Sequence, residues 1–517
     1  MKKPIIRKSI FILFFITINC FAYARIYVSV QGSGNGSGSS WSNASTLENA
    51  IAAAPSNTDI WVKAGNYIVN STLLCERSGL SIYGGFTGNE TALNQRDWKN
   101  NITTLDGQGT VKIMRFVSNN GIIDGIHFVN GYVTGTAHEI NDGGGALRLA
   151  GKNQIIRNCS FIDNISNSER GAGAIFIWFG ENQLIENCLF RNNSQSYSTY
   201  ANGGGAIHNW DKNVTIKNCQ FIDNSSTNSG GALYTWGDNI TVENCLFENN
   251  KSTTSGGAIY VSGNTTNIVN CLFKNNSTDK MGGAISNRET LSITNSTFVS
   301  NTNTAVSFSG YNCILQIYNS IFFNNSSKGS HLKDVDGDYA DENETDYRNN
   351  IFEENTLGEH NLVGVDPLFV NVEGGDFTPK AFSPAHDFGD NNLYNQVATT
   401  ALSESTDLAN KPRLFGTNID AGAYEIQQIL STEDTSTDQA VSVFPNPTTD
   451  LLNITSKTAN FTKMEVFTIL GQRLMERPIN FLSSSTITID ISSLSSGIYL
   501  LKLSNSKSQK TYRIMKK

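Results

Sequence analysis

The sequence predicts an all-β protein: a single-stranded right-handed parallel β-helix followed by a small C-terminal β-sandwich. Composition gives the first indication, because the 517 residues include 62 Asn, 45 Gly and only 9 Pro, with 16% charged side chains. A helical chain of this size would instead be rich in Ala, Leu, Glu and Lys. The second indication is a repeated unit, and the third is its period of 24–31 residues, which suits two or three short strands.

The repeated unit reads Gly-Gly-Ala-Ile, a gap, and then Ile-x-Asn-Cys-x-Phe-x-x-Asn. Its second half recurs, with Ser replacing Cys in the last two copies, at residues 158–161, 187–190, 218–221, 244–247, 270–273, 295–298 and 319–322. We expect one unit to form one coil, with coils stacked at about 4.8 Å, the spacing of strands in a sheet. The Asn would occupy turns, where its backbone tolerates the left-handed conformation, and the Phe and the Ile before it would stack inside.

The first 24 residues are interpreted as a secretory signal peptide and excluded from the fold. Four Lys and Arg precede an apolar run over residues 10–18, and Ala-Tyr-Ala at residues 22–24 gives a small-x-small cleavage site. Cleavage removes four cations and no acid, so the net charge changes from −8 to −12. This charge argues against a nucleic-acid partner. No later apolar stretch reaches the ~20 residues of a transmembrane helix.

The β-helix with its N-terminal cap is expected to span residues 25–330. An open coil would expose an unpaired strand edge, and an amphipathic helix over residues 47–54 could cover it. The preceding Ser45-Thr46-Leu47-Glu48 has the pattern of a capping box.

The cysteines argue against a disulfide scaffold. Seven remain after signal cleavage, which is an odd number, and five of them recur at one repeat position. Other coils place Ser296 or Ser320 there, so the position is interpreted as a small interior site holding free thiols. A metal site would need clustered ligands such as Cys-x-x-Cys, and the sequence has none.

Beyond the repeats the composition changes. Residues 331–430 contain an acidic loop and then short motifs at 366–369, 383–387 and 419–425, and they are interpreted as a segment that closes the β-helix. Residues 431–440 form a polar linker. In residues 441–517 apolar and polar side chains alternate as they do along β-strands, and this pattern predicts the small β-sandwich.

These motifs resemble known families. The Gly-Gly-Ala-Ile and Phe-x-x-Asn units, over residues 25–425, resemble secreted bacterial right-handed β-helix proteins of the pectate-lyase-like superfamily and the repeats of chlamydial polymorphic outer-membrane proteins. The tail, with Phe-Pro-Asn-Pro at 444–447, Gly-Gln at 471–472 and Gly-Ile-Tyr at 497–499, resembles the type A C-terminal sorting domain of the type IX secretion system of Bacteroidota. That resemblance implies export by this machinery, cleavage of the tail, and a body that is released or held on the cell surface.

Function is predicted on the strand after each Gly-Gly-Ala, where side chains alternate between core and surface. One set is mostly aliphatic and would face the core. The opposite set would form two columns, namely Arg148, Phe176, His208, Tyr234, Tyr260 and Ser286, and beside them Ala150, Trp178, Trp210, Trp236, Ser262 and Arg288. Exposed rings such as Phe176, Trp178, Trp210 and Trp236 would stack on the sugar rings of an extracellular polysaccharide. Alternatively, residues 194–202 or 328–430 cover these rings as a second apolar layer.

Three acids follow the Trp column on consecutive coils: Glu181, Asp211 and Asp238. Carboxylates one coil apart would lie near ~5 Å and two coils apart near ~10 Å, separations compatible with retaining and inverting glycosidases. They are candidate substrate-binding residues, although Asp at a turn is usually structural. The Asn-Thr-Asp and Gly-His-Gly signatures of polygalacturonases are absent.

Among enzymes, the same face favours a lyase. β-Elimination of a uronate needs a cation that neutralises the carboxylate, a base for the C5 proton and an acid for the leaving oxygen. Arg148 or Arg288 would neutralise the carboxylate, while His208 with Tyr234 or Tyr260 would act as base and acid. Ca²⁺ is an alternative neutralising group, with candidate ligands at Asp334, Asp336 and Asp338.

Two functions therefore stay open. One is a secreted lyase acting on a polysaccharide that contains uronic acid. The other is a non-catalytic surface adhesin or glycan-binding protein, in which the β-helix is a rigid rod. We expect a monomer in either case.

Overall fold

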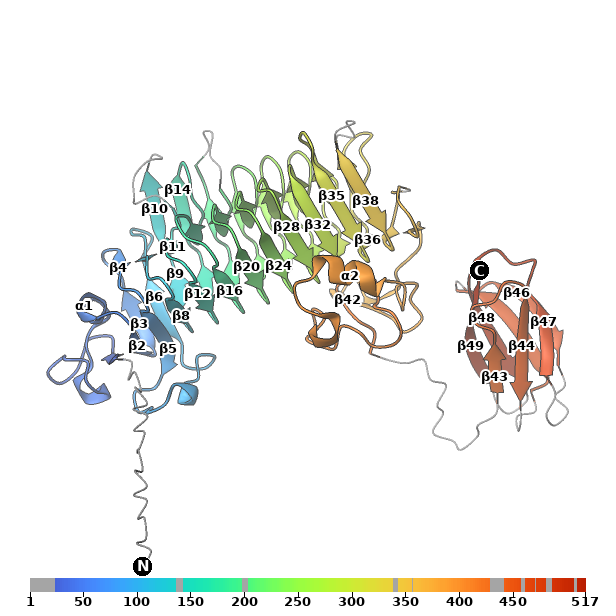
Figure 1. Cartoon of the computed structure of the whole chain (residues 1–517), viewed down its shortest axis with the longest axis horizontal. Helices are drawn as coiled ribbons and strands as arrows, with labels where there is room; N and C mark the ends of the chain where they lie inside the picture. The colour runs from blue at the N-terminus through green and yellow to red at the C-terminus, as the bar shows by residue number, and fades with distance from the viewer. Residues whose placement is uncertain are drawn as a thin grey trace, which may run out of the picture.

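A computed structural model describes most of the chain: residues 24–135, 143–197, 203–337, 343–355, 357–427, 441–456, 461–469, 471–479, 486–505 and 509–517. The predicted signal peptide, apart from Ala24, and the predicted linker lie outside these residues. Figure 1 shows the coils stacked from the blue N-terminal end to the yellow end, followed by a small red β-domain. The predicted fold class is confirmed.

Parallel sheets form the walls of the β-helix, and each coil passes in turn through sheets A, B and C, with a short sheet D between B and C in the middle coils. Sheet A contains β1 (Ala24–Val28), β2 (Thr58–Lys63), β5 (Ser81–Phe86), β8 (Ile122–Asp124), β12 (Ile155–Arg157), β16 (Leu184–Glu186), β20 (Val214–Lys217), β24 (Ile240–Glu243), β28 (Thr266–Val269), β32 (Thr290–Thr294), β35 (Ile314–Tyr318) and β38 (Glu344–Arg348). Sheet B contains β3 (Gly65–Ile68), β6 (Thr103–Asp106), β9 (His127–Val129), β13 (Ser160–Ile162), β17 (Leu189–Arg191), β21 (Gln220–Ile222), β25 (Leu246–Glu248), β29 (Leu272–Lys274), β33 (Thr297–Val299), β36 (Ile321–Phe323), β39 (Ile351–Phe352) and β40 (Leu362–Val363).

Sheets C and D complete each coil. Sheet C contains β4 (Leu73–Cys75), β7 (Met114–Phe116), β11 (Leu147–Leu149), β15 (Ile175–Ile177), β19 (Ile207–Asn209), β23 (Leu233–Thr235), β27 (Ile259–Val261), β31 (Ile285–Asn287), β34 (Val306–Phe308) and β37 (Val335–Gly337). Sheet D contains β10 (Tyr132–Gly135), β14 (Ile165–Ser168), β18 (Ser194–Gln195), β22 (Ser225–Ser226), β26 (Lys251–Ser252) and β30 (Ser277–Thr278). Because β37 to β40 pair within these sheets, the coils continue past the predicted boundary at residue 330, and the acidic loop lies within a coil.

A ladder of phenylalanine rings fills the interior, as the repeat predicts. Neighbouring rings lie 4.5–4.9 Å apart and within 8° of parallel from Phe128 through Phe161, Phe190, Phe221, Phe247, Phe273 and Phe298 to Phe322. Each ring is buried, so its packing adds to the ~25 cal/mol gained for each Å² of apolar surface removed from water.

The repeated asparagines divide into two columns. The last Asn of each unit is buried, and its amide nitrogen donates to the amide oxygen of the next coil at 2.9–3.1 Å, from Asn164 to Asn325. The Asn before each Cys or Ser, and Asn349 at the equivalent position of the next coil, have φ values of 49–57°, the left-handed turn that the sequence predicts. This second set is called the corner Asn column and comprises Asn158, Asn187, Asn218, Asn244, Asn270, Asn295, Asn319 and Asn349.

The seven cysteines among the described residues are buried and free, as predicted. In the five repeat cysteines from Cys159 to Cys271, the thiol donates to the carbonyl oxygen two residues earlier at 3.1–3.2 Å. Ser296 and Ser320 make the same bond at 3.1 and 2.8 Å. Cys and Ser therefore alternate at this position because both fill a small space with one hydrogen-bond donor.

Helix α1 (Leu47–Ala53) lies at the N-terminal end and buries Leu47, Ala50 and Ile51 in the core of the β-helix. The predicted capping box is wrong, because Ser45 is not the N-cap and a single side-chain cap bond is present. Thr46 is the N-cap, and its hydroxyl accepts from the backbone nitrogen of Asn49 at 3.4 Å. The helix covers the first coil as the sequence predicts.

The closing segment, residues 364–427, packs along the side of the last coils and contains β41 (Phe369–Asn371), β42 (Asp376–Pro379) and α2 (Asn391–Val397). Phe369 and Phe377 pack against sheet B residues such as Leu272, Val299 and Ile321. The corner Asn column anchors the same segment, since Asn295 donates to Asp420 O at 2.8 Å and Asn319 to Asp390 O at 3.0 Å.

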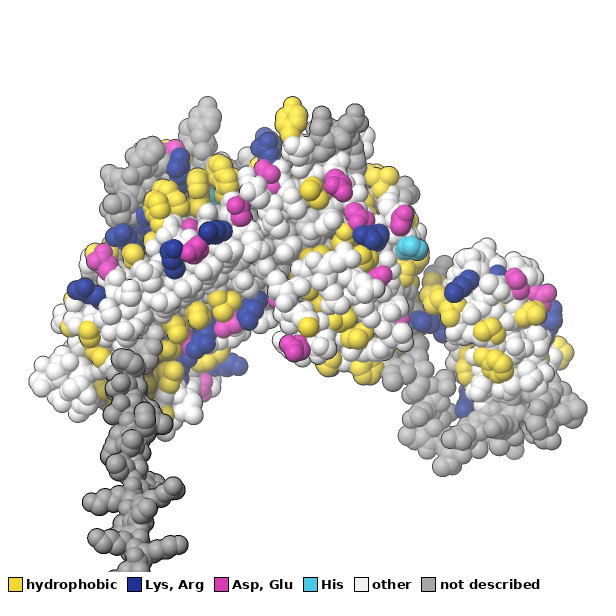
Figure 2. Space-filling view, viewed as in Figure 1, with side chains coloured by type: hydrophobic (Ala, Val, Ile, Leu, Met, Phe, Trp, Pro, Cys, Tyr) yellow, Lys and Arg dark blue, Asp and Glu magenta, His cyan; other side chains and the backbone are white. Residues whose placement is uncertain are grey.

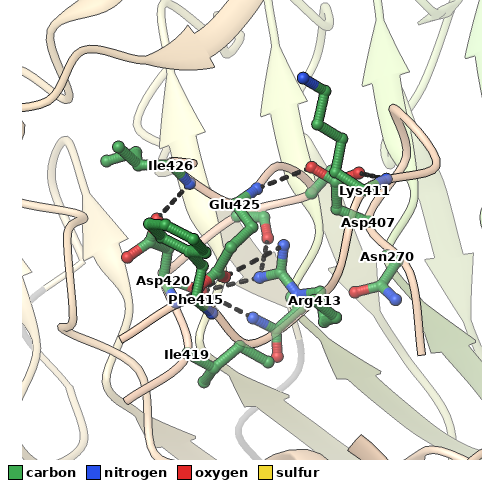
Figure 3. Close-up of polar contacts among 12 residues, drawn as sticks. Asn270, Asp407, Lys411, Arg413, Phe415, Ile419, Asp420, Glu425 and Ile426 are labelled. Carbon is green, nitrogen blue, oxygen red and sulfur yellow. Dashed lines mark hydrogen bonds and ion pairs between the residues drawn. The ribbon is translucent and has the colours of Figure 1, made fainter. Parts of the chain in front are cut away.

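A buried ionic network holds the closing segment together (Figure 3). Arg413 is fully buried and donates to the carbonyl oxygens of Asp420 and Gly422, both at 2.8 Å. The Glu425 carboxylate lies 3.8 Å from the Arg413 guanidinium and accepts the backbone N–H groups of Phe415 and Asp420. Burial raises the pKa of Glu425 to about 8. The network therefore fixes the backbone of the segment from inside.

The C-terminal domain is a small β-sandwich, as predicted. One sheet contains β43 (Val441–Phe444), β44 (Leu451–Ser456) and β47 (Thr486–Asp490). The other contains β46 (Arg473–Pro478), β45 (Lys463–Thr468), β48 (Gly497–Ser504) and β49 (Gln509–Lys516). Leu452 and Ile454 of the first sheet pack with Met464, Val466 and Leu501 of the second in a core of their own.

Candidate functional site

The strands of sheet C alternate as predicted. Their inward residues, from Leu147 and Leu149 to Ile259 and Val261, are fully buried. Strand pairing aligns the two outward columns coil by coil, with Arg148 beside Phe176, Phe176 beside His208, and Tyr234 beside Tyr260.

The first outward column is covered, which corrects the expectation of a fully exposed face. Phe176 and His208 are fully buried, Tyr234 nearly so, and only Tyr260 is half-exposed. Gly143 lies so close to Phe176 that a Cβ on that glycine would approach the ring to 2.5 Å. On the other side, the Trp210 indole donates to His208 Nε2 at 2.5 Å. The glycine turns and the second column thus cover the first column.

The second outward column remains accessible. Trp178 and Trp210 are half-buried, and Trp236 is 45% exposed. Their ring centroids lie 5.9 Å apart between Trp178 and Trp210 and 4.7 Å apart between Trp210 and Trp236. Residues 364–427 pack their apolar clusters on sheets A and B, so among the described residues this part of the 328–430 segment does not cover the rings. Residues 198–202 of the other proposed cover lie outside the described residues.

Phe179 extends this surface, and the sequence reasoning missed it. Its ring is 67% exposed and stacks on Trp178 at 4.1 Å and 18°. Strand pairing leaves three residues between Ile177 and Glu181 but two in each neighbouring coil, so this coil carries one inserted residue. Phe179 has a φ of 76°, which is rare for a bulky residue and marks a strained position. Counting residues between aligned repeats would have revealed the insertion.

The aromatic platform is defined here as Phe179, Trp178, Trp210 and Trp236. In Figure 2 hydrophobic side chains gather on this upper part of the β-helix, above a row in which basic and acidic side chains alternate. The platform runs across three coils, parallel to the stacking direction. An extended ligand lying on it would therefore cross the strands of sheet C.

Arginines border the platform. The Arg148 guanidinium lies 5.6 Å from the Trp178 ring centroid and 5.9 Å from that of Phe179, although the residue is buried. Arg170, also missed from the sequence, lies 5.5 Å from the Trp210 ring. Arg288 is exposed at the far end and donates to Tyr260 Oη at 3.5 Å. Cation–π contacts of this kind contribute about 0.5–2 kcal/mol and hold the rings in place.

Burial determines the chemistry of the predicted acid–base residues. It lowers the pKa of His208 to about 3, so His208 is neutral and accepts the Trp210 hydrogen bond. Burial also raises the pKa of Tyr234. A polymer on the platform cannot contact either group directly. Among the predicted acid–base residues, only Tyr260 reaches the surface, where it meets Arg288.

The three acids do not form one column, because the Phe179 insertion shifts the alignment. Glu181 aligns with Lys152 and Lys212 and is paired with both, at 2.7 and 3.2 Å. These lysines lower the pKa of Glu181. Asp211 instead lies one residue earlier in its coil and accepts from Gly180 N at 2.8 Å.

Asp211 and Asp238 differ in environment. Asp211 is buried, which raises its pKa to about 6, whereas Asp238 is exposed and accepts from Asn264 N at 3.1 Å. All three carboxylates thus have structural partners. The arrangement places alternating charges beside the platform rather than a pair of facing carboxylates.

The acidic loop does not bring its described carboxylates together. Asp334 is buried with its pKa raised to about 6, and it accepts from Glu354 N at 2.9 Å. Asp336 accepts from His331 Nδ1 at 2.5 Å on the outer side of sheet C, and Asp338 lies outside the described residues. The two described carboxylates therefore do not come together as ligands of one Ca²⁺ ion.

A second cluster of possible ligand atoms comprises His386, Asp387 and Asp420. Its carboxylates already accept backbone N–H groups. Asp420 accepts from Asp387 and Ile426, both at 2.6 Å, and Asp387 accepts from Asn418 at 3.1 Å. This cluster therefore orders the closing segment.

Comparison with known families separates the chain into parts. Residues 442–517 match the secretion system C-terminal sorting domain, residues 99–269 the right-handed β-helix region, and residues 270–288 the Chlamydia polymorphic membrane protein repeat. The protein is thus exported by the type IX machinery and is either released or attached at the cell surface. No helix in the described residues is long and apolar enough to cross a membrane.

No curated protein matches the sequence. Among solved structures, pectate lyase Pel9A is 12% identical, with a TM-score of 0.50 over 78% of this chain and 96% of its own. A rhamnogalacturonan lyase is 14% identical, with a TM-score of 0.36 over 68% of this chain and 91% of its own. Tailspike protein gp49 from Acinetobacter baumannii bacteriophage Fri1, a capsular polysaccharide depolymerase, is 12% identical, with a TM-score of 0.27 over 89% and 73%. The likeness to Pel9A is one of fold.

Proposed function

We propose that this exported β-helix binds polysaccharide along the aromatic platform. One observation carries the proposal: three tryptophans on consecutive coils, extended by Phe179, form a row of partly exposed rings with centroids 4.1–5.9 Å apart. Sugar rings have apolar faces and polar edges, and they pack on such rings while their hydroxyls keep contact with water and polar neighbours.

The polymer that fits best is linear and acidic. The platform is straight over three coils, so successive sugars would meet successive rings. Arg170 and Arg288 lie at its border and would attract carboxylates of uronic acids. The paired Lys152–Glu181–Lys212 row adds one further net positive charge beside it.

The test is calorimetric titration of the mature chain with pectate, alginate, ulvan and a glycosaminoglycan. Trp210→Ala and Phe179→Ala should each weaken binding at least about tenfold, a loss of about 1.4 kcal/mol, because each removes one ring on which a sugar would pack. Trp98→Ala serves as the matched control, because Trp98 is half-buried and lies outside the platform. Unchanged affinity in the two platform variants would refute the proposal.

A lyase acting on uronic acid is the second candidate, and the Arg288–Tyr260 contact favours it. Arg288 would neutralise the uronate carboxylate. Tyr260, as a phenolate, would take the C5 proton, whose electron pair forms the C4–C5 double bond while the C4–O bond breaks. The same proton would then pass from Tyr260 to the leaving oxygen.

This candidate has its own readout, the absorbance of the new C4–C5 double bond. Tyr260→Phe removes one oxygen and should abolish the signal without weakening binding. If no polymer of the panel gives the signal with the unsubstituted chain while binding persists, the protein is a glycan binder and the lyase is excluded.

A further inference from the structure

A groove of about 410 Å³ runs between the closing segment and the corner of sheets A and B. The β-helix contributes Asn187, Asn218 and Asn244 of the corner Asn column, and the closing segment contributes Leu408, Asn410 and Tyr424. This volume lies in the range of small-molecule sites. The groove is on a different wall of the β-helix from the aromatic platform.

The corner Asn column changes partners along its length. In the last coils its amides donate to backbone carbonyls of the closing segment, as in Asn270 to Thr406 O at 3.2 Å and Asn349 to Phe388 O at 3.0 Å. Toward the N-terminus the column leaves the closing segment and lines the groove with Asn244, Asn218 and Asn187. Because Asn187 already donates to Asn158 Oδ1, Asn218 and Asn244 are the corner asparagines whose amides are available to the cavity.

One of these asparagines, Asn244, has a side-chain hydrogen-bond acceptor without a partner. The Oδ1 atom of Asn244 is buried and has no partner among the described residues. A buried acceptor without a partner costs about 1–3 kcal/mol, so a rotation of this side chain that brings Oδ1 to the groove surface and to a bound hydroxyl group would be favourable. Asn244 has a φ of 51°, the left-handed turn conformation of the corner Asn column.

The other residues that line the groove indicate which kind of ligand it would bind. Glu248 and Lys274 are the charged side chains of the lining, and they pair with each other at 2.6 Å. The half-buried Tyr424 ring offers an aromatic surface, and burial raises its pKa to about 12, so its hydroxyl remains a donor. Leu246, Leu272 and Leu408 belong to the apolar cluster beneath.

We propose that this groove is a second carbohydrate site, which takes an uncharged oligosaccharide. Its hydroxyls would bond the amides of Asn218 and Asn244, and one sugar ring would stack on Tyr424. An anionic polymer suits it poorly, because Lys274 is already neutralised by Glu248. The proposal does not depend on the aromatic platform.

The experiment titrates the full mature chain with cellohexaose, xylohexaose, mannohexaose and maltohexaose in a calorimeter. The double variant Asn218→Gly/Asn244→Gly deletes both amides and keeps the left-handed turns, which glycine adopts without strain. Asn249→Gly is the matched control, since Asn249 has a φ of 56° and is exposed away from the groove.

We expect at least one hexasaccharide to bind, the double variant and Tyr424→Leu to weaken that binding at least about tenfold, and Asn249→Gly to leave it unchanged. Trp210→Ala should also leave it unchanged, which separates the groove from the platform. The proposal is overturned if none of the four probes binds, if the double variant binds like the unsubstituted chain, or if Trp210→Ala abolishes binding. Asn218→Asp, which keeps the side-chain shape, repeats the test should the double variant have a lowered Tm.

Discussion

The same coils form two kinds of outer face, one exposed to solvent and the other covered by another part of the chain. The outer face of sheet C presents the aromatic platform to solvent, whereas sheets A and B are covered in the last coils by the closing segment. On sheet C the outward residues include Trp, Phe and Tyr with arginines. On the covered walls they are Leu272, Val299 and Ile321, which meet Phe369 and Phe377.

The difference shows that the repeat specifies the inside of the coil and leaves the outside free. The Phe ladder and the buried Asn ladder continue unchanged beneath both faces. Function and cover are then set by the few residues that point outward. A substitution inside the coil should therefore affect both faces, and a substitution of an outward residue should affect one face. A conservative substitution at a position that touches neither face should affect neither.

The largest effect is expected inside the ladder, because both faces rest on it. Phe221→Ala removes a buried ring that stacks on Phe190 and Phe247, each at 4.7 Å. The loss of burial and the remaining cavity should lower the free energy of unfolding by about 3–5 kcal/mol. Chemical denaturation of the mature chain measures this, and glycan binding at the platform should be lost at the same denaturant concentration. A change below about 1 kcal/mol would contradict the ladder's role.

A smaller and more local effect is expected from the covered face. Arg413→Met removes two hydrogen bonds to the backbone and leaves the carbonyl oxygens of Asp420 and Gly422 without this donor. Each buried acceptor left without a donor costs about 1–3 kcal/mol, and the loss is confined to the closing segment. Hydrogen exchange should rise over residues 405–426, while affinity at the platform stays unchanged. Loss of both properties would show that the two faces are coupled.

The same network predicts a pH dependence of the covered face. Glu425 has a folded pKa of about 8, above its unfolded value, so the folded state holds the proton more tightly. Its contribution to stability is fully present below the unfolded pKa and is lost as the pH rises through about 8, by at most about 1.4 kcal/mol per pH unit. Protease sensitivity of residues 405–426 should thus increase from about pH 5 to about pH 8 and level off above that. Glu425→Gln should remove this increase, and a variant with the same pH profile as the unsubstituted chain would contradict the assignment.

Particular residues show how far the sequence determines these faces. The spacing of the Phe, Cys and Asn positions predicts the coils and their interior, because each coil must repeat the same packing. It also places Trp178, Trp210 and Trp236 correctly in one row. The burial of His208 could not be predicted, since it depends on neighbours such as Trp210, whose indole bonds to the His208 ring. The alignment of Glu181 with Lys212 escaped detection because one inserted residue, Phe179, changes the local count.

The smallest effect is expected at a repeat position that touches neither face. Cys245 is buried, and its thiol donates to Glu243 O at 3.2 Å, the bond that the hydroxyl of Ser296 makes to Thr294 O at 3.1 Å. Cys245→Ser keeps the size and the donor, so the free energy of unfolding should fall by less than about 1 kcal/mol. Platform binding and closing-segment exchange should both stay unchanged. If the free energy of unfolding fell as much as in Phe221→Ala, sulfur rather than any small donor would be required at this position. The alternation of Cys and Ser among the coils would then need another cause.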